Sequence, residues 1–272
     1  MHQSQLSDQH IHSEFSPDSK VSVGTICEAS LARGMSVIAI TDHCECDSYW
    51  RFDYDHTTVA SAQAAKAAAD RYRGRLEVLA GIELGQAFQE KEVACKVLSR
   101  APYDFVLGSM HNTGTFEDFS KIDLATCGES LEDLLAMYYE EMVQLVRWDQ
   151  IDSLAHLTYP LRYLEGGLHM EIDMTPYLPI LDEVYRALIE TGTALEINTS
   201  GLRQAYGKCM PDLGYLRRYR ELGGELITIG SDAHFPQDVN AGIIDGHALA
   251  KAAGFTHITY FKGRSPRYIK LD

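Results

Sequence analysis

Short apolar runs alternate with longer amphipathic segments along almost the whole chain. The apolar runs predict β-strands at residues 5–12, 37–41, 76–83, 105–109, 153–156, 195–198, 226–230 and 257–261. Most are continuously apolar, which is typical of parallel strands buried on both faces of a sheet. The segments between them predict helices at residues 23–34, 58–72, 130–148, 175–191, 213–222 and 246–253. This alternation of strands and helices indicates an α/β fold.

The alternation continues to the end of the sequence without a linker, so residues 1–272 are expected to form a single domain. About eight parallel strands in this length favour a closed or nearly closed β/α barrel. A doubly wound open sheet is the competing arrangement. The sequence contains neither a GxGxxG nor a P-loop pattern, which disfavours the nucleotide-binding versions of that open sheet.

The overall charge is strongly acidic, with 39 Asp and Glu against 24 Lys and Arg and a net charge of −15. Sequence-independent binding to DNA, RNA or an anionic membrane needs a basic face, so neither a nucleic acid polymer nor a membrane is expected as a partner. No apolar stretch approaches the roughly 20 residues of a membrane span, and the first residues lack signal-peptide features. We therefore expect a cytoplasmic protein with reduced thiols at Cys27, Cys44, Cys46, Cys95, Cys127 and Cys209.

Residues able to bind a metal ion stand at the end of nearly every predicted strand. They are His10 and His12, Asp42 and His43, Glu83, His111, His156, and Asp232 and His234. Because the carboxyl ends of parallel strands meet at one rim of a barrel, we expect these side chains to converge there. Residues two apart on a strand face the same side, so His10 and His12 reach one centre.

The metal interpretation depends on the joint pattern. A single buried histidine is more often a hydrogen-bonded core residue than a ligand, and His-x-His alone is a weak signal. Six strand ends with ligand-type residues are different, because core packing would favour Val or Ile there. Imidazole and carboxylate together suit Zn, Fe or Mn rather than Ca or Mg alone. The sequence therefore predicts a cluster of divalent metal ions.

The order and spacing of these motifs resemble those of the PHP (polymerase and histidinol phosphatase) family, from Asp8 to Leu271. The matching motifs are Asp8-Gln-His-Ile-His12, Thr41-Asp-His43, Gly81-Ile-Glu83, Gly108-Ser-Met-His-Asn112, Glu196-Ile-Asn-Thr199 and Gly230-Ser-Asp-Ala-His234. Residues 196–203 and the ending Phe261-Lys-Gly-Arg264-Ser-Pro266 are similar, more narrowly, to the histidinol-phosphatase branch.

The resemblance implies a distorted (β/α)7 TIM-like barrel that holds a trinuclear centre of divalent ions, with Zn, Mn and Fe as the candidates. The first ion would bind His10, His12, Glu83 and Asp232, the second Glu83, His111 and His156, and the third Asp18, His43 and His234. Many members have a histidine where this chain has Asp18. Aspartate is a competent ligand, but the difference could weaken the third site or change its metal preference.

The resemblance also implies a phosphoric monoester hydrolase that converts L-histidinol phosphate to L-histidinol and phosphate in histidine biosynthesis. A metal-bound hydroxide would attack phosphorus in line, because such ions lower the pKa of bound water to about 7. Arg162 and Arg203 follow two of the strands and are candidates for bidentate phosphate contacts. Each could equally be a solvated surface arginine. Asp232 and His234 are the candidates for general acid at the leaving alkoxide.

Histidinol phosphate carries an ammonium group and an imidazole ring, so acidic and aromatic side chains are expected near the rim. Residues 45–53 follow His43 and have that composition, from Glu45 and Asp47 through Trp50 to Asp53. A surface loop anchored by Trp50 is the alternative interpretation. Cys44 and Cys46 are not expected to bind metal, because the His and carboxylate set is complete without them.

Three other functions remain open. The first is hydrolysis of another small phosphoester, such as a nucleotide or a cyclic phosphodiester. The second is C–N hydrolysis on a related barrel, which is disfavoured because the bridging position falls to Glu83 rather than to a lysine. The third is a non-enzymatic, structural PHP domain. That is disfavoured because all nine positions carry competent ligands, and a complete set of buried polar groups is costly without metal.

Overall fold

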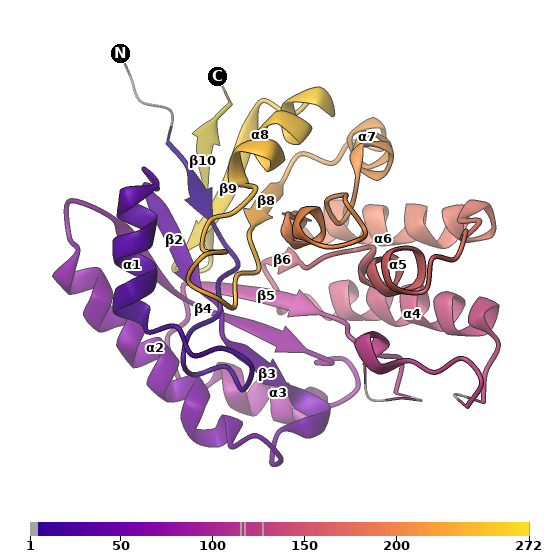
Figure 1. Cartoon of the computed structure of the whole chain (residues 1–272), viewed down its shortest axis with the longest axis horizontal. Helices are drawn as coiled ribbons and strands as arrows, with labels where there is room; N and C mark the ends of the chain where they lie inside the picture. Colours follow the sequence, from indigo (N-terminus) through magenta and orange to yellow (C-terminus); the bar gives the residue numbers. More distant parts are fainter. Residues whose placement is uncertain (1–4, 115, 117, 127, 272) are drawn as a thin grey trace.

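Parallel strands form a nearly closed barrel in the part of the chain that the computed structural model describes, residues 5–114, 116, 118–126 and 128–271. Seven described strands follow one another in the order β1-β2-β4-β5-β6-β7-β8 (Figure 1). Their bounds are β1 Ser7–Asp8, β2 Val37–Ile40, β4 Glu77–Gly85, β5 Phe105–Ser109, β6 Ser153–Leu154, β7 Ala194–Asn198 and β8 Ile227–Gly230. The predicted barrel is confirmed, and the open sheet is wrong.

The chain just after β1 brings the first and last strands of this path together. Gln9 N donates to Ile229 O at 2.8 Å, and Asp232 N donates to His10 O at 2.7 Å. The extended prediction for residues 5–12 therefore describes the path of the chain, although only Ser7–Asp8 forms a regular ladder with β2. This contact places His10 directly beside the end of β8.

Helices surround the barrel between successive strands (Figure 1). Their bounds are α1 Val23–Ala32, α2 Tyr54–Arg71, α3 Lys91–Leu98, α4 Leu131–Arg147, α5 Tyr159–Leu161, α6 Leu178–Thr191, α7 Leu213–Glu221 and α8 Ile243–Ala252. Ser22 and Ser130 cap α1 and α4 by accepting a bond from a backbone N–H of the first turn. Gly192, at φ 70°, ends α6 in the left-handed conformation that other residues rarely adopt.

Alternate residues of the strands separate two apolar layers. Ile38 and Ile40 of β2 belong to the large cluster that also contains the helix residues, whereas Val37 and Ala39 belong to a second cluster with Phe105 and Phe261. Since neighbouring strand residues point to opposite faces, the second cluster fills the barrel side of the sheet. It leaves the carboxyl ends of the strands for polar residues.

The predicted strand 257–261 is a strand, but its expected place among the parallel strands is wrong. β9 His257–Lys262 pairs antiparallel with β10 Ser265–Lys270 in a separate two-stranded sheet. Gly263 and Arg264 join them with positive φ at both positions, as a two-residue hairpin turn requires. The run is apolar because Phe261 packs on Phe105 of β5, with ring centroids 5.6 Å apart.

Several elements were not predicted, and one of them, β3 His43–Glu45, lies at the predicted site. β3 pairs with the second half of β4, so that His43 lies beside Glu83 and Glu45 beside Gly85. Helix α3 follows at Lys91–Leu98. Short turns of 3-10 helix at Cys46–Ser48, Phe119–Lys121, Thr175–Tyr177 and Ser200–Arg203, and a π-helical turn at Arg162–Gly167, complete the described elements.

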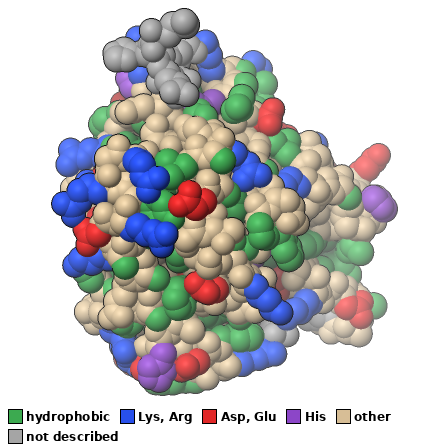
Figure 2. Space-filling model, turned by 60° about the vertical axis from the view of Figure 1, so that its left-hand side comes forward, with side chains coloured by type: hydrophobic (Ala, Val, Ile, Leu, Met, Phe, Trp, Pro, Cys, Tyr) green, Lys and Arg blue, Asp and Glu red, His purple; other side chains and the backbone are tan. Residues whose placement is uncertain are grey.

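Charged side chains of both signs share the surface. On the face shown in Figure 2, Asp and Glu side chains lie among the Lys and Arg side chains. Several such neighbours are paired, as in Arg73 with Asp70 and Lys262 with Glu77. The expectation that polyanions are not partners stays a prediction.

The structure bears in part on two expectations, the absence of a membrane span and the presence of reduced thiols. Within the described residues, no helix combines the length and apolar character needed to cross a membrane. Of the six cysteines, those at positions 27, 44, 46, 95 and 209 are free thiols, and Cys127 lies outside the described residues.

Candidate metal centre

The carboxyl ends of the barrel strands bring histidines and carboxylates together in three groups among the described residues. In each group, one ligand atom per residue lies within 4.8 Å of the others: His10, His12 and Glu83; Glu83, His111 and His156; and His12, His43 and His234. Glu83 belongs to two groups, as expected of a bridging carboxylate. His12 also belongs to two, which the sequence did not predict.

The two predicted aspartates border these groups. Asp232 Oδ1 is 3.4 Å from His12 Nε2 and 3.7 Å from His10 Nε2. Asp18 Oδ2 is 3.3 Å from His234 Nε2 and 3.5 Å from His43 Nε2. The structure therefore brings all nine predicted positions into one region, although Asp18 is about half exposed.

Two of these residues have unusual backbone conformations. His156 has φ 24° and Asp232 has φ 53°, both positive and both uncommon for residues with a β-carbon. Backbone strain of this kind persists where surrounding contacts over-determine it, and it concentrates at functional sites. Here it turns both side chains from the strand ends toward Glu83 and His12.

A carboxylate sets the orientation of His10. His10 Nδ1 lies 2.7 Å from Glu196 Oε1, and Glu196 Oε2 accepts from the backbone N–H of His156 at 2.9 Å. Because an ionised carboxylate only accepts hydrogen bonds, Nδ1 carries the hydrogen and Nε2 faces the centre. Gly230 makes this pair possible, since a β-carbon there would collide with both Glu196 and His10.

His12 is oriented through a serine. Ser16 Oγ donates to Asp42 Oδ1 at 2.8 Å and accepts from the backbone N–H of His43 at 3.1 Å. Its one hydrogen is thus used, so His12 Nδ1, at 3.1 Å from the same oxygen, must be the donor. The Nε2 atom of His12 therefore presents a lone pair to the centre.

These orientations fit a divalent cation. His10 Nε2 and His12 Nε2 face each other at 3.0 Å. Glu83 Oε2 lies 2.7 Å from His43 Nδ1 without hydrogen-bond geometry, and Oε2 has no hydrogen-bond partner among the described residues. Lone pairs converging in a buried space need a positively charged species between them. Neutral imidazole and carboxylate are the donor set that Zn, Mn and Fe accept.

The pKa shifts of the buried histidines and of Glu83 also indicate that the carboxylates of the centre need positive charge nearby. Burial lowers the pKa of His10, but the charges of Glu196, Glu83 and Asp232 outweigh burial and raise it well above the ordinary value. Burial, with the charges of His234 and His43, lowers the pKa of His12 to about 3. Burial raises the pKa of Glu83, yet His43 and His10 hold it well below its ordinary range. Without cations, protons on some histidines balance the carboxylates.

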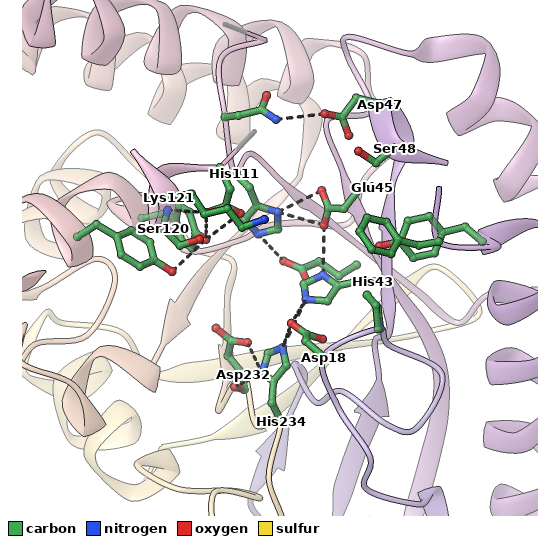
Figure 3. A pocket seen from close by; sticks show the side chains of 18 of the residues that line it. Asp18, His43, Glu45, Asp47, Ser48, His111, Ser120, Lys121, Asp232 and His234 are labelled. Carbon is green, nitrogen blue, oxygen red and sulfur yellow. Dashed lines mark hydrogen bonds and ion pairs between the residues drawn. The ribbon is translucent and has the colours of Figure 1, made fainter. Parts of the chain in front are cut away.

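A cavity of about 420 Å³ opens over these residues (Figure 3). Residues of the metal groups that line it are His43, Glu83, His111 and His234, beside Asp18 and Asp232. The outer walls are acidic and aromatic, from Glu45, Asp47, Phe52 and Tyr54 and from Asp118, Ser120, Lys121, Tyr159 and Tyr163. This space can take a small molecule with one end against the histidines.

The two predicted phosphate-binding arginines lie in different places. Arg162 lines the cavity, with Nη1 3.4 Å from Ser200 Oγ and 3.7 Å from Asp232 Oδ2. Arg203 is not among the residues that line it. Its Nη2 donates to the carbonyl oxygens of Ser231 at 2.9 Å and Asp232 at 3.3 Å. The structure thus brings Arg162, but not Arg203, to the cavity.

The segment 45–53 borders the cavity through Glu45, Asp47 and Phe52. The alternative interpretation, a loop anchored by Trp50, is wrong because Trp50 is 74% exposed while its neighbour Tyr49 is buried. Cys44 and Cys46 are buried, and neither belongs to a metal group of the described residues. Their expected absence from the centre stays a prediction.

Sequence reasoning missed the residues that support the ligands. Glu196 and Asp42 lie within the motifs quoted above, yet nothing in their spacing shows which histidine each would serve. Glu45 was noted only for substrate recognition, and Ser16 was not noted at all. A usable signal is an acidic residue between apolar residues of a buried strand, as at Glu196 between Leu195 and Ile197, because a buried carboxylate needs a partner.

The chain matches proteins of one family over most of its length. The family model of the PHP domain matches residues 8–200. A probable histidinol-phosphatase of Clostridium acetobutylicum is 27% identical over 263 residues, which cover 96% of this chain and 98% of that protein. A histidinol-phosphatase of Lactococcus lactis is 29% identical over 266 residues, 94% of each chain. The predicted resemblance is confirmed.

A solved structure shares the fold. The crystal structure of histidinol phosphate phosphatase from Lactococcus lactis, complexed with Zn, L-histidinol and phosphate, matches with a TM-score of 0.79 and 24% identity. The match covers 97% of this chain and 99% of that chain. At this identity the likeness establishes the barrel and its strand order.

Proposed function

Because the chain belongs to the PHP domain family, we propose that it is a metal-dependent phosphomonoesterase that hydrolyses L-histidinol phosphate to L-histidinol and phosphate. One observation carries the proposal: three groups of metal-binding residues lie under a cavity with acidic and aromatic walls, and His43, Glu83, His111 and His234 of these groups line it. The full-length relatives named histidinol-phosphatase support the substrate. The Zn, histidinol and phosphate in the related structure support it as well.

The nine predicted ligands would hold three divalent cations. His10, His12, Glu83 and Asp232 form one proposed set, Glu83, His111 and His156 the second, and Asp18, His43 and His234 the third. When bound, such cations polarise phosphoryl oxygens and make water acidic enough to act as a nucleophile near neutral pH. His12 is close enough to His43 and His234 to serve the third set as well.

Arg162 and two of the proposed ligands would bind the phosphoryl group and move the proton. The Arg162 guanidinium faces the cavity beside Asp232 and can contact phosphate oxygens. His234 reaches the cavity and can hold a proton for the departing alkoxide, with Asp232 as the second candidate. Arg203 would act indirectly, because its bonds to the carbonyls of Ser231 and Asp232 fix the backbone at that ligand.

The outer walls suit a substrate that carries a cation and an aromatic ring. Asp47 and Asp118 supply carboxylates from two different segments, and Phe52 and Tyr159 supply ring faces. An ammonium group gains Coulomb energy beside such carboxylates, and an imidazole packs on aromatic faces. The lining carboxylates outnumber the two lining cations, Lys121 and Arg162, which favours a cationic leaving group over a nucleotide.

The test is a comparison of kcat/KM for histidinol phosphate with values for other small phosphoesters, using protein loaded with Zn, Mn or Fe in turn. We expect phosphate release that stops with a chelator, returns with metal, and is fastest for histidinol phosphate by at least tenfold. A higher kcat/KM for a nucleotide or a cyclic phosphodiester would reject the substrate. Metal-loaded protein that hydrolyses no phosphoester would reject the enzyme class.

A further inference from the structure

Glu45 lies between two histidines that belong to different metal groups (Figure 3). His111 Nδ1 is 3.1 Å from Glu45 Oε1 and 3.2 Å from Oε2. His43 Nδ1 is 3.2 Å from Oε1 of the same carboxylate. His43 Nδ1 also approaches Glu83 Oε2 at 2.7 Å, so Glu45 shares this nitrogen, whereas no other carboxylate contact is found for His111 Nδ1 among the described residues.

The inner nitrogens of both rings point into the groups. His111 Nε2 is 3.4 Å from Glu83 Oε1, and His43 Nε2 is 3.4 Å from His234 Nε2. At His111 the carboxylate accepts the Nδ1 hydrogen, which fixes the tautomer and the ring plane and leaves Nε2 for a metal ion. At His43 the same carboxylate lies at ion-pair distance from Nδ1 and attracts that side of the ring by its charge. Glu45 therefore contacts the Nδ1 side of two rings, as Glu196 contacts Nδ1 of His10.

The backbone around Glu45 is shaped to hold it. It pairs in register with Gly85, where any β-carbon would collide with the Glu45 carboxylate. The next residue, Gln86, has φ 50°, a conformation that costs free energy for a residue with a side chain. With its amide nitrogen turned to Glu45, Gln86 donates to Oε2, and its amide oxygen accepts from His111 N at 2.8 Å.

We propose that Glu45 is a positioning residue that orients His43 and His111 together and so couples the occupancy of two metal positions. This inference rests on the proposed function, because it concerns the same centre. When one ion orders His111, Glu45 is held in the place where it also orders His43. The second ion then binds a ring whose orientation is already fixed, and part of its ordering cost has been met.

The competing role for Glu45 is a direct contact with the substrate ammonium group. Asp47 provides the matched control, because it lies two residues away and lines the same cavity. Its carboxylate accepts from Asn112 Nδ2 at 3.2 Å, and no contact with a histidine is found for it among the described residues. Removing its charge changes the cavity but leaves the histidine orientations alone.

The experiment titrates Zn into metal-free wild type, Glu45→Gln and Asp47→Asn, with calorimetry and elemental analysis as readouts. We expect Glu45→Gln to lose about 10–100-fold in affinity at two positions together, the usual loss when the partner of a ligand histidine is removed. The ion held by His10, His12, Glu83 and Asp232 should bind as in wild type. Asp47→Asn should bind all three ions normally and raise KM. Excess Zn should restore kcat of Glu45→Gln.

Three outcomes decide the matter. Wild-type affinity for every ion in Glu45→Gln, with only KM raised, would make Glu45 a substrate contact and overturn the inference. A loss of Zn affinity at only one metal position in Glu45→Gln would overturn the proposed coupling. If wild type binds the ions but releases no phosphate, the proposed function fails while the titration still decides the role of Glu45. Should Glu45→Gln not fold, Glu45→Asp, which keeps the charge with a shorter reach, should show the same paired loss to a smaller degree.

Discussion

Three buried histidines at this centre owe their orientation to an oxygen atom that contacts Nδ1, on the side of the ring away from the metal groups. Glu196 stands behind His10, Ser16 behind His12 and Glu45 behind His111. A buried imidazole with a free choice of tautomer would present a hydrogen to the centre as often as a lone pair. These partners remove that choice, so the nitrogens are prepared to bind a cation before one arrives.

The close approach of His10 and Glu196 depends on the absence of a side chain at position 230. A β-carbon on Gly230 would collide with the Glu196 carboxylate and the β-carbon of His10. We expect Gly230→Ala to lower the free energy of unfolding by about 1–3 kcal/mol, as overpacking usually does. Because the displaced pair orients His10, the variant should also bind fewer equivalents of Zn.

Denaturant unfolding with elemental analysis measures both effects. The control is Gly34→Ala, which tests a glycine with open space around its would-be β-carbon and φ 75°. It should lose stability through backbone strain alone and retain the wild-type metal content. Full metal content in Gly230→Ala would contradict the role given to this contact.

The sequence predicted the ligands but not their supports, for a physical reason. A ligand at a strand end stands out, because His or Glu replaces the Val or Ile that core packing would favour. A support is defined by its partner, and Glu196 and His10 lie 186 positions apart in the chain. Ser16, a common polar residue in a loop, carries no signal until the fold brings it to Asp42 and His12.

At the scale of elements, apolar runs located the barrel strands within a few residues, but they did not reveal which strands pair. The run at 257–261 is as apolar as a barrel strand, and it forms a hairpin whose Phe261 packs on Phe105. Burial on both faces produces the same sequence pattern in either place. The Gly263–Arg264 turn followed by a second strand is the local signal that distinguishes them.

The hairpin contributes to stability from the barrel side opposite the metal groups. Phe261 is buried in the same cluster as Val37, Leu79 and Phe105 of the barrel strands. We expect Phe261→Ala to lower the free energy of unfolding by about 3–5 kcal/mol, as is usual for a buried Phe. The exposed Tyr268 on the partner strand is the control. Tyr268→Ala should change the free energy of unfolding by less than about 0.5 kcal/mol.

Folded Phe261→Ala protein should bind Zn as wild type does, because none of the metal groups includes a hairpin residue of the described chain. Chemical denaturation and Zn titration of the same preparations check the two expectations. A change in Zn affinity without a change in stability would show that the hairpin reaches the centre.

At the scale of the whole molecule, the net charge of −15 is consistent with a cavity that attracts cations. Glu83, Asp232 and Glu45 lie close together and are largely buried, and burial by itself would raise their pKa values. Neighbouring histidines instead hold the pKa of Glu45 at about 2 and those of Glu83 and Asp232 well below the ordinary range. The metal-free fold therefore depends on protonated histidines in place of cations.

This dependence fixes the sign of the pH effect on the metal-free protein. Burial lowers the pKa values of His10, His43 and His111, but neighbouring carboxylates raise them well above 6.5. Above pH 6.5 these histidines keep protons that the unfolded chain has lost, so stability falls as pH rises, by about 1.4 kcal/mol per pH unit for each such proton. His12, with a pKa of about 3, adds a slope of the opposite sign only near pH 6.5, and this slope fades about one pH unit higher, where the unfolded chain has also lost that proton.

Bound Zn should reverse that slope. A metal ion replaces the protons on the histidines, so its affinity increases as pH rises and the imidazoles deprotonate. At a free concentration one hundred times its dissociation constant, one ion adds about 2.7 kcal/mol to the free energy of unfolding.

Melting temperatures between pH 6.5 and 8 should therefore decrease with pH in chelator and increase, or stay level, with saturating Zn. His111→Ala, which lacks one of the raised groups, should show a shallower decrease in chelator. Metal-free protein that grew more stable across this range would mean that the histidines do not carry the balancing protons, and the electrostatic account of the centre would have to be abandoned.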